Sequence, residues 1–534
     1  MSVAAERKTQ DALKKSSFAS VTALIGLQLF SRLFTFILNQ SLIRMTSPEI
    51  FGAAAIQFEL ILSTILFLSR EGVRTTILRV QNPSRLSPKE LNLSFVPIGV
   101  GIPLATAIAW SYARCAGEQL RNGVFFREAV GVYACAAVLE LLTEPFHNLS
   151  MIQLKTNIRV KAEGTGVCIT SSLYLRRKKD ARKDGQGRLA LLAFALGQLA
   201  YSLACLVVYA GYFGAGTLRP QTSGEGTGFV DIQLFKLSAT MTWQSIIKHV
   251  LTEGDKLVLS WFSPLQDQGG YALAVNYGSL IARILFQPIE EVMRFYFSKT
   301  FAQGTKPSQT QSALKDAANA LISLVSVQLE LSLFFLVFGT AYLPVLLPIL
   351  LPPRYMATSA PQILAAWIWY IPVLAVNGGL EGFVASVAST KDLNIQSRWM
   401  VAFSCIFLAT AVSLYRLGAG DASLVYANIV NLLARIVFGV VFAKSFFVGK
   451  GAGDLFSIGR ALPPISLLII SFAMWSTVSY DGKRRNVENI VRVEGRGSLL
   501  NVDVVQHVGI GSALALVWLS YWWLSSGHKR HWRP

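Results

Sequence analysis

Charged and polar side chains recur at helical spacing in or just after long apolar runs, and these are the residues whose chemistry could define a site. An ionised side chain near the centre of a bilayer costs from about 2.5 to more than 10 kcal/mol, so such groups usually face protein or water. Four runs carry such a stripe, at 18–43, 50–69, 238–263 and 269–298. The candidate substrate-cavity residues on these stripes are Arg32, Glu59, Arg70, Glu71, Arg74, His249, Glu253, Lys256, Arg283, Glu290 and Arg294.

Two interpretations of these side chains are open. In the first, they form structural pairs within the helices, with Glu253 paired to His249 or Lys256 and Glu290 paired to Arg294. In the second, the four stripes line one water-filled cavity between two lobes. The second interpretation is favoured because four idle polar stripes would be very costly in a membrane.

Arginine is prominent in the first half of the chain, and it indicates an anionic ligand. Arg70 and Arg74 are spaced i,i+4 and share a helix face, with Glu71 within reach of Arg74. The guanidinium is a planar fork that suits phosphate oxygens. A diphosphate head that carries hydroxyl-rich sugars would find both cationic and acceptor partners here. A drug–cation antiporter would more naturally keep an unpaired acid in the first run, which holds Arg32 and no carboxylate.

The sequence does not contain the residue patterns that an enzyme, a metal site or a nucleotide-driven pump would require. No Ser/His/Asp or Cys/His set converges, so the chain is not expected to be an enzyme and no catalytic residue is assigned. His249 has no second ligand at useful spacing, so neither a metal site nor another cofactor is expected. No GxxxxGK[ST] loop occurs, which argues against a nucleotide as energy source. The net charge of +19 is explained by basic cytosolic loops, without nucleic acid as a partner.

The elements that must position these residues are transmembrane helices. The chain has 534 residues, of which 52% are hydrophobic and 15% charged, whereas soluble domains carry roughly 25% charged residues. Runs of about 20 apolar residues, the length that crosses a bilayer, follow one another. We predict an all-α polytopic membrane protein with about fourteen spans, at 18–43, 50–69, 93–115, 127–150, 159–176, 189–212, 238–263, 269–298, 313–339, 360–387, 398–418, 422–447, 460–479 and 507–526.

The spans divide into two six-helix lobes with an appendage. We expect an N-lobe at 1–212, a linker loop at 213–237, a C-lobe at 238–450, and two additional helices with a basic tail at 451–534. A shift of 220 residues places Glu71 on Glu291 and Arg74 on Arg294, which indicates pseudo-twofold repeats of the kind found in transporters. Basic loops favour cytosolic termini. The basic loops at 176–183 and 483–496 disagree with this topology, because both fall on the opposite side.

Four segments carry a resemblance to a known family. They are Phe67-Leu68-Ser69-Arg70-Glu71-Gly72-Val73-Arg74, Glu253-Gly254-Asp255-Lys256, Phe286-Gln287-Pro288-Ile289-Glu290-Glu291 and Asn377-Gly378-Gly379-Leu380-Glu381-Gly382-Phe383. With them the chain resembles, over about its whole length, the Rft family of eukaryotic oligosaccharide-translocation proteins. The resemblance implies the multidrug/oligosaccharidyl-lipid/polysaccharide exporter superfamily, a multi-pass protein of the endoplasmic reticulum membrane, and a role in dolichol-linked oligosaccharide assembly for N-glycosylation.

The resulting hypothesis is a glycolipid flippase that moves Man5GlcNAc2-diphosphodolichol from the cytosolic to the lumenal leaflet by alternating access. Its partners would be the dolichol-linked oligosaccharide and membrane lipids. Two alternatives stay open. One is a secondary antiporter for small solutes, and the other is a non-transporting organiser that works with the glycosylation machinery.

Overall fold

The computed structural model describes Gln40, 43–44, 46–77, 88–121, 123, 125–153, 155–181, 190–220, 230–302 and 307–527. Every regular element in these ranges is helical. The chain divides into two compact units, which we call the N-unit (Ser41–Ala272) and the C-unit (Leu273–Pro534 with Met1–Gln40). The boundary between the units falls within helix α13, whereas the sequence was expected to have its linker at 213–237. The division into two six-helix lobes related by symmetry stays a prediction.

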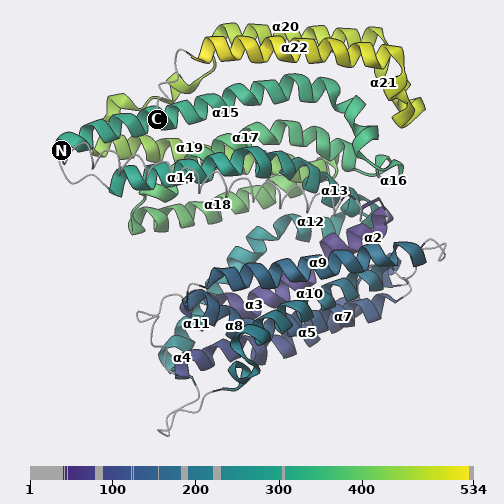
Figure 1. Cartoon of the computed structure of the whole chain (residues 1–534), viewed down its shortest axis with the longest axis vertical. Helices are drawn as coiled ribbons and strands as arrows, with labels where there is room; N and C mark the ends of the chain where they lie inside the picture. The colour runs from purple at the N-terminus through teal and green to yellow at the C-terminus, as the bar shows by residue number, and fades with distance from the viewer. Residues whose placement is uncertain are drawn as a thin grey trace, which may run out of the picture. The chain divides into compact units, whose positions relative to one another are not determined.

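The N-unit is a bundle of helices (Figure 1). Its elements are α2 (Pro48–Gly52), the π-helical turn η1 (Ala53–Phe58), α3 (Glu59–Ile77), α4 (Pro88–Asn92), η2 (Leu93–Phe95), α5 (Val96–Cys115), α6 (Glu118–Arg121), α7 (Phe126–Leu141), α8 (Glu144–Ile152), α9 (Thr156–Ala181), α10 (Ala190–Phe213), η3 (Ala215–Leu218), α11 (Ile232–Thr252), α12 (Gly254–Phe262) and the first half of α13 (Leu265–Ile281).

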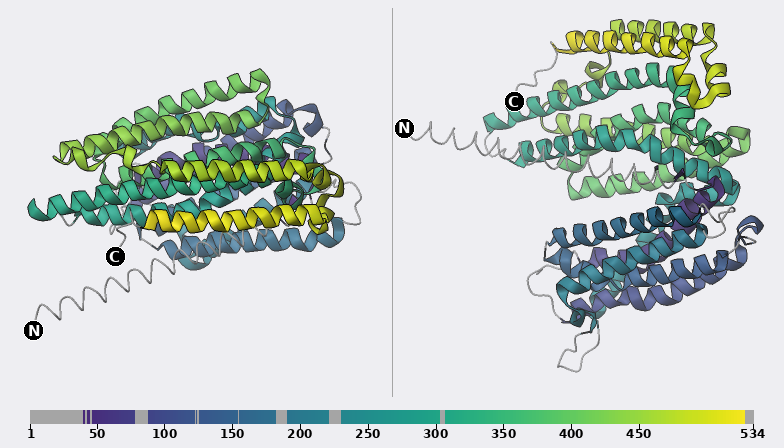
Figure 2. Two further views of the ribbon diagram at one scale, coloured as in Figure 1. Left: turned by 90° about the horizontal axis from the view of Figure 1, so that it is seen from above. Right: turned by 45° about the vertical axis from the view of Figure 1, so that its right-hand side comes forward.

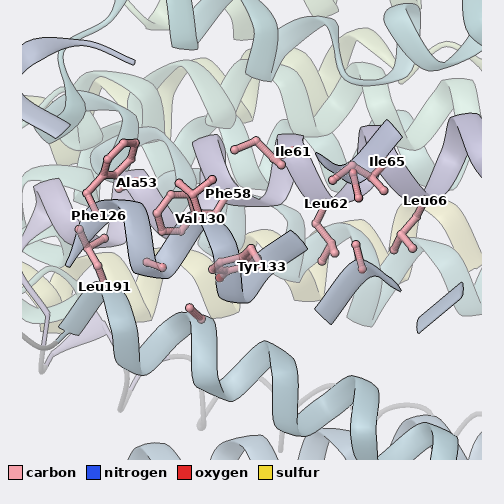
Figure 3. Packing of buried hydrophobic residues seen from close by; sticks show 14 of the residues in the cluster. Ala53, Phe58, Ile61, Leu62, Ile65, Leu66, Phe126, Val130, Tyr133 and Leu191 are labelled. Carbon is pink, nitrogen blue, oxygen red and sulfur yellow. The ribbon is translucent and has the colours of Figure 1, made fainter. Parts of the chain in front are cut away.

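The core of the N-unit lies between α3, α5, α7 and α10 (Figure 3). Phe58 is fully buried there, with its ring centroid 4.8 Å from that of Tyr133 and 6.2 Å from that of Phe126. Such aromatic pairs add to the free energy gained from burial of apolar surface. On its other side α3 packs along α11, so the seventh predicted span is part of this unit.

The C-unit is a second bundle with two long helices at its C-terminal end. Its elements are the second half of α13, the π-helical turn η4 (Ala282–Phe286), α14 (Gln287–Ala302), α15 (Pro307–Leu350), α16 (Pro353–Met356), α17 (Ala360–Val387), α18 (Thr390–Leu414), η5 (Tyr415–Ala419), α19 (Ala422–Gly449), η6 (Gly453–Leu455), η7 (Ile458–Ala461), α20 (Ile465–Arg484), α21 (Val487–Glu494), η8 (Gly495–Leu500) and α22 (Val502–Gly527).

Two contacts organise the C-unit. Helix α17 packs between α14, α15 and α19, where Phe297, Phe383 and Phe447 are fully buried. Helices α20 and α22 lie side by side and rest on α15 (Figure 2), with the buried Trp518 donating a hydrogen bond to Ser471 at 2.8 Å. The last two helices are therefore attached to the C-unit by their own apolar and polar contacts.

Ten helices in the described part of the chain are long and apolar enough to cross a membrane. They coincide with ten of the fourteen predicted spans, which confirms an all-helical polytopic membrane protein. The spans predicted at 159–176, 238–263 and 269–298 are occupied by helices α9, α11–α12 and α13–α14, which carry more polar residues. The span predicted at 18–43 lies almost wholly outside the described residues.

Candidate functional site

Two arginines at the C-terminal end of α3 form a buried ion network with two glutamates. Arg70 Nη1 donates to Glu140 Oε1 at 2.8 Å and to Glu144 Oε1 at 3.5 Å. Arg74 holds Glu144 with two donors, Nε at 2.8 Å and Nη2 at 2.5 Å. The Glu144 side chain is fully buried, while those of Arg70 and Arg74 are 20% and 23% exposed. We call these four residues the charge quartet.

The glutamates reach α3 because the fourth span is interrupted between them. Helix α7 ends at Leu141 and α8 begins at Glu144, with Pro145 in the first turn of α8, where a proline is tolerated because it needs no N–H partner. The hydroxyl of Thr143 donates to the Glu140 carbonyl oxygen at 2.6 Å in the connection. Both carboxylates therefore face the same stretch of α3.

The sequence pattern assigned a different partner to Arg74. Local spacing placed Glu71 within its reach, but Arg74 bonds to Glu144, which lies 70 positions away. Glu140 and Glu144 were not among the candidate residues. Their i,i+4 spacing matches that of Arg70 and Arg74, and this complementary pair of spacings is the signal that would have found them.

On its other side α3 meets α11 and α12. Gly72 allows a close approach, since a Cβ atom there would lie 2.5 Å from the Ser238 carbonyl oxygen and 2.7 Å from the Thr242 nitrogen. His249 is buried against α3, with Nε2 3.0 Å from the Thr64 hydroxyl and its ring stacked on Phe67 at 4.7 Å. This histidine is therefore held in the packing between two helices.

The break between α11 and α12 positions a second charged group. Glu253 has non-helical backbone angles, and Gly254 starts α12. Across this break Lys256 Nζ lies 2.8 Å from Glu253 Oε2. Glu59 at the start of α3 is close enough to interact electrostatically with both. The N-unit thus brings Glu59 close to Glu253 and Lys256, which follow it by almost 200 residues in the chain.

In the C-unit the candidate residues lie on η4 and α14. Arg283 donates to the Asn276 side chain at 3.2 Å and to the carbonyl oxygens of its own helix. Arg294 donates to Glu290 at 2.8 Å, with its side chain 49% exposed. Gly378 of α17 approaches Glu290 closely, because a Cβ there would lie 2.9 Å from Oε2. The pairs Glu253–Lys256 and Glu290–Arg294, which the structural interpretation of these side chains predicts, are both present.

The structure therefore places the candidate residues in two groups. The group in the N-unit lies on α3 or on the α11–α12 segment beside it, and consists of Glu59, Arg70, Glu71, Arg74, His249, Glu253 and Lys256. The group in the C-unit follows η4 and α14, and consists of Arg283, Glu290 and Arg294. Arg32 lies outside the described residues. A single cavity lined by both groups stays a prediction.

One further ion pair in the C-unit was missed. Arg435 of α19 bonds to Glu381 of α17, the helix whose glycines pack on α14 and α15. Glu381 stood in a recognised motif, but its partner lies 54 positions away. Among the described residues, no group of three His, Cys, Asp or Glu side chains is arranged to hold a metal ion.

Two solved structures share this fold. The structure titled "Lipid II flippase MurJ, inward closed conformation" matches with a TM-score of 0.61 and 10% sequence identity, covering 94% of this chain and 99% of that one. An inward-facing multidrug resistance MATE family transporter of the MOP superfamily matches with a TM-score of 0.52 and 12% identity, covering 77% of this chain and 94% of that one. At these identities the likeness shows the fold alone.

Sequence comparison is more specific. A relative from Yarrowia lipolytica, the "Man(5)GlcNAc(2)-PP-dolichol translocation protein RFT1", is 34% identical over 497 residues, covering 83% of this chain and 72% of the relative. The protein of the same name from Saccharomyces cerevisiae is 30% identical over 491 residues, covering 82% and 84%. The family model described as "Rft protein" matches residues 16–528. This multi-pass chain belongs to the Rft family.

Proposed function

We propose that this chain moves Man5GlcNAc2-diphosphodolichol from the cytosolic to the lumenal leaflet of the endoplasmic reticulum membrane, with both of its termini in the cytosol. The names of the relatives supply the substrate, and the fold is one that transporters use. No bond is made or broken. The two lobes rock about a cavity that binds the headgroup, while the lipid tail stays in the bilayer.

The observation that carries the proposal is the charge quartet, because it presents two arginines that keep unused hydrogen-bond donors. A guanidinium has five N–H donors. Glu144 occupies two of those on Arg74, and the carboxylates hold Arg70 through Nη1 alone. Both arginines are partly exposed. A diphosphate can take up the remaining donors in the bidentate geometry that guanidinium and phosphate share.

The geometry also separates the roles of the two arginines. Arg74 is held by two short bonds to a fully buried carboxylate, so it anchors the quartet. Arg70 is held at one nitrogen and is the freer of the two to turn toward a headgroup. We assign the first phosphate contact to Arg70, and a second contact to Arg74, which offers its remaining donors while it holds Glu144 in place. The Glu59, Glu253 and Lys256 group would meet the sugars, whose hydroxyls pair with either charge.

Reconstitution tests the proposal. Purified protein is placed in vesicles with labelled glycolipid, and the exchange of the label between leaflets is timed. We expect faster exchange with the wild-type protein, a strong reduction for Arg70→Gln, and nearly normal exchange for Arg159→Gln, a matched change at an exposed pair with Glu163. Equal exchange with and without the protein would refute the flippase, and normal N-glycosylation in cells expressing Arg70→Gln would point to the organiser.

A further inference from the structure

A separate cavity lies inside the N-unit, between α3, α5 and α12. Its volume is about 630 Å³, within the range of about 300–1,000 Å³ typical of small-molecule sites. It is bounded by one face of η1 and α3, by the C-terminal end of α5 with α6, and by the connection from α12 to α13. Gln57 contributes to it, 13 residues before Arg70 on the same helical span, which is about 20 Å along the axis.

The base of the cavity is a network of side-chain amides. Gln57 Nε2 donates to Gln268 Oε1 at 2.8 Å, and Tyr112 donates to Gln57 Oε1 at 3.0 Å. Gln268 in turn donates to the carbonyl oxygens of Leu259 and Ser263. Gln57 is 7% exposed and keeps one N–H and one carbonyl lone pair beyond these bonds. It stands in the π-helical turn η1, a feature frequent at functional sites.

The walls of the cavity are largely aliphatic, with the hydroxyls of Thr64, Ser260 and Ser263 among them, and its rim is aromatic. Leu60, Ile61, Ile108 and Leu257 contribute aliphatic surface, and Trp261 at the rim is 74% exposed. The lining contains one charged side chain, Glu118, which is 86% exposed. A phosphate would have no cationic partner in this lining. The composition therefore favours an uncharged ligand with a long apolar body and a small polar group.

We propose that this cavity binds a neutral lipid whose only polar group is a hydroxyl. The hydroxyl bonds to the Gln57 amide, the hydrocarbon lies along the aliphatic wall, and the Trp261 ring covers it at the rim. Sterols and unphosphorylated polyisoprenols both have this chemistry. The cavity and the charge quartet lie on separate stretches of the α2–α3 span, so ligand binding here does not depend on the proposed transport.

Photolabelling of the purified full-length protein tests the site. The probes are a diazirine sterol and a diazirine polyprenol, each compared with its methyl ether, which cannot donate a hydrogen bond. We expect at least one free alcohol to label peptides that contain residues 57–64 or 108–120. Gln57→Leu should lower this labelling about ten-fold, the loss expected for one hydrogen bond of ordinary strength. The two probes identify which kind of alcohol is bound.

Two further measurements keep the proposal testable if Gln57→Leu folds poorly. Trp261→Ala should weaken labelling, whereas Trp243→Ala, at a tryptophan 70% exposed on α11, should leave it unchanged. In the wild-type protein, Cys115 lines the cavity and Cys405 is exposed in the C-unit. The bound alcohol should slow alkylation of Cys115 several-fold and leave Cys405 unaffected. Labelling by neither alcohol, or equal labelling by alcohol and methyl ether, would overturn the proposal.

Discussion

Exchanging the charges of Arg74 and Glu144 separates a structural role of the quartet from a role in headgroup binding. Removing one partner of a buried ion pair costs about 3–5 kcal/mol. Glu144 is fully buried but Arg74 is 23% exposed, so we expect the lower end. Each single variant, Arg74→Glu and Glu144→Arg, should lose about 3 kcal/mol, which corresponds to a fall in Tm of about 6–12 °C for a unit of this size. The double variant should recover most of that loss.

Thermal unfolding in detergent measures this first outcome, and glycolipid exchange in vesicles measures the second. The exchanged pair places the guanidinium on α8 and the carboxylate on α3. If Arg74 only holds Glu144, the double variant regains both stability and exchange. If the position of the guanidinium on α3 is needed to present donors to the diphosphate, stability returns while exchange stays low. The second result is the one we expect.

A matched pair controls for nonspecific effects of charge reversal. Arg159 and Glu163 on α9 are also 2.8 Å apart, but both side chains are more than 40% exposed. Exposed pairs contribute about 0.2–1 kcal/mol, so both single reversals there should leave Tm nearly unchanged. The direct pairing of Arg74 with Glu144 is wrong if the double variant is no more stable than the less stable single variant.

Three other changes test separate features of the two units. Gly72→Ala should lower stability by about 1–3 kcal/mol because the backbone of α11 occupies the space of a Cβ. Gly131→Ala within α7, with nothing within 4 Å, should not lower Tm and should raise it slightly, because alanine favours the helix. Asn148 stands in a glycosylation sequon, but it is 4% exposed and donates a hydrogen bond to Ser94. We therefore expect glycosidase treatment to leave the gel mobility of the protein unchanged. A change in mobility that is lost in Asn148→Gln would contradict the burial of this side chain. Arg294→Gln should change the free energy of unfolding by less than about 1 kcal/mol, because the Arg294 side chain is 49% exposed. Reduced glycolipid exchange in this variant would then report an effect on transport. Unchanged exchange would show that Arg294 is not part of the substrate cavity.

Features that depend on local spacing could be predicted from the sequence. The lengths of the apolar runs gave most spans, because a bilayer demands about 20 apolar residues wherever a helix crosses it. The pairs Glu253–Lys256 and Glu290–Arg294 follow from i,i+3 and i,i+4 geometry, and both are present. The family motifs also pointed to the Rft family, which the comparisons show.

Features that depend on which helices become neighbours could not be predicted in this way. The spacing of Arg74 identifies a face of α3 but not the helix opposite that face, and the partner proved to be Glu144 across a helix break. The packing of α11 on α3 is another such case. Spacing along the sequence does not reveal that Gly72 admits the backbone of α11 against α3. Only the tertiary structure makes these pairings visible.

The balance of charge in the quartet bears on how a flippase could release its ligand. Arg70, Arg74, Glu140 and Glu144 sum to zero, so the site is not a strong trap for anions. A diphosphate that takes up the remaining donors of Arg70 shares that guanidinium with Glu140, so its gain is offset by repulsion from the carboxylate. Two unpaired arginines in a low-dielectric site would bind a diphosphate far more tightly, and release into the second leaflet would be slow. Carboxylates that stay on the arginines throughout keep the free energies of the loaded and empty sites close, and downhill movement driven only by lumenal consumption requires such a balance.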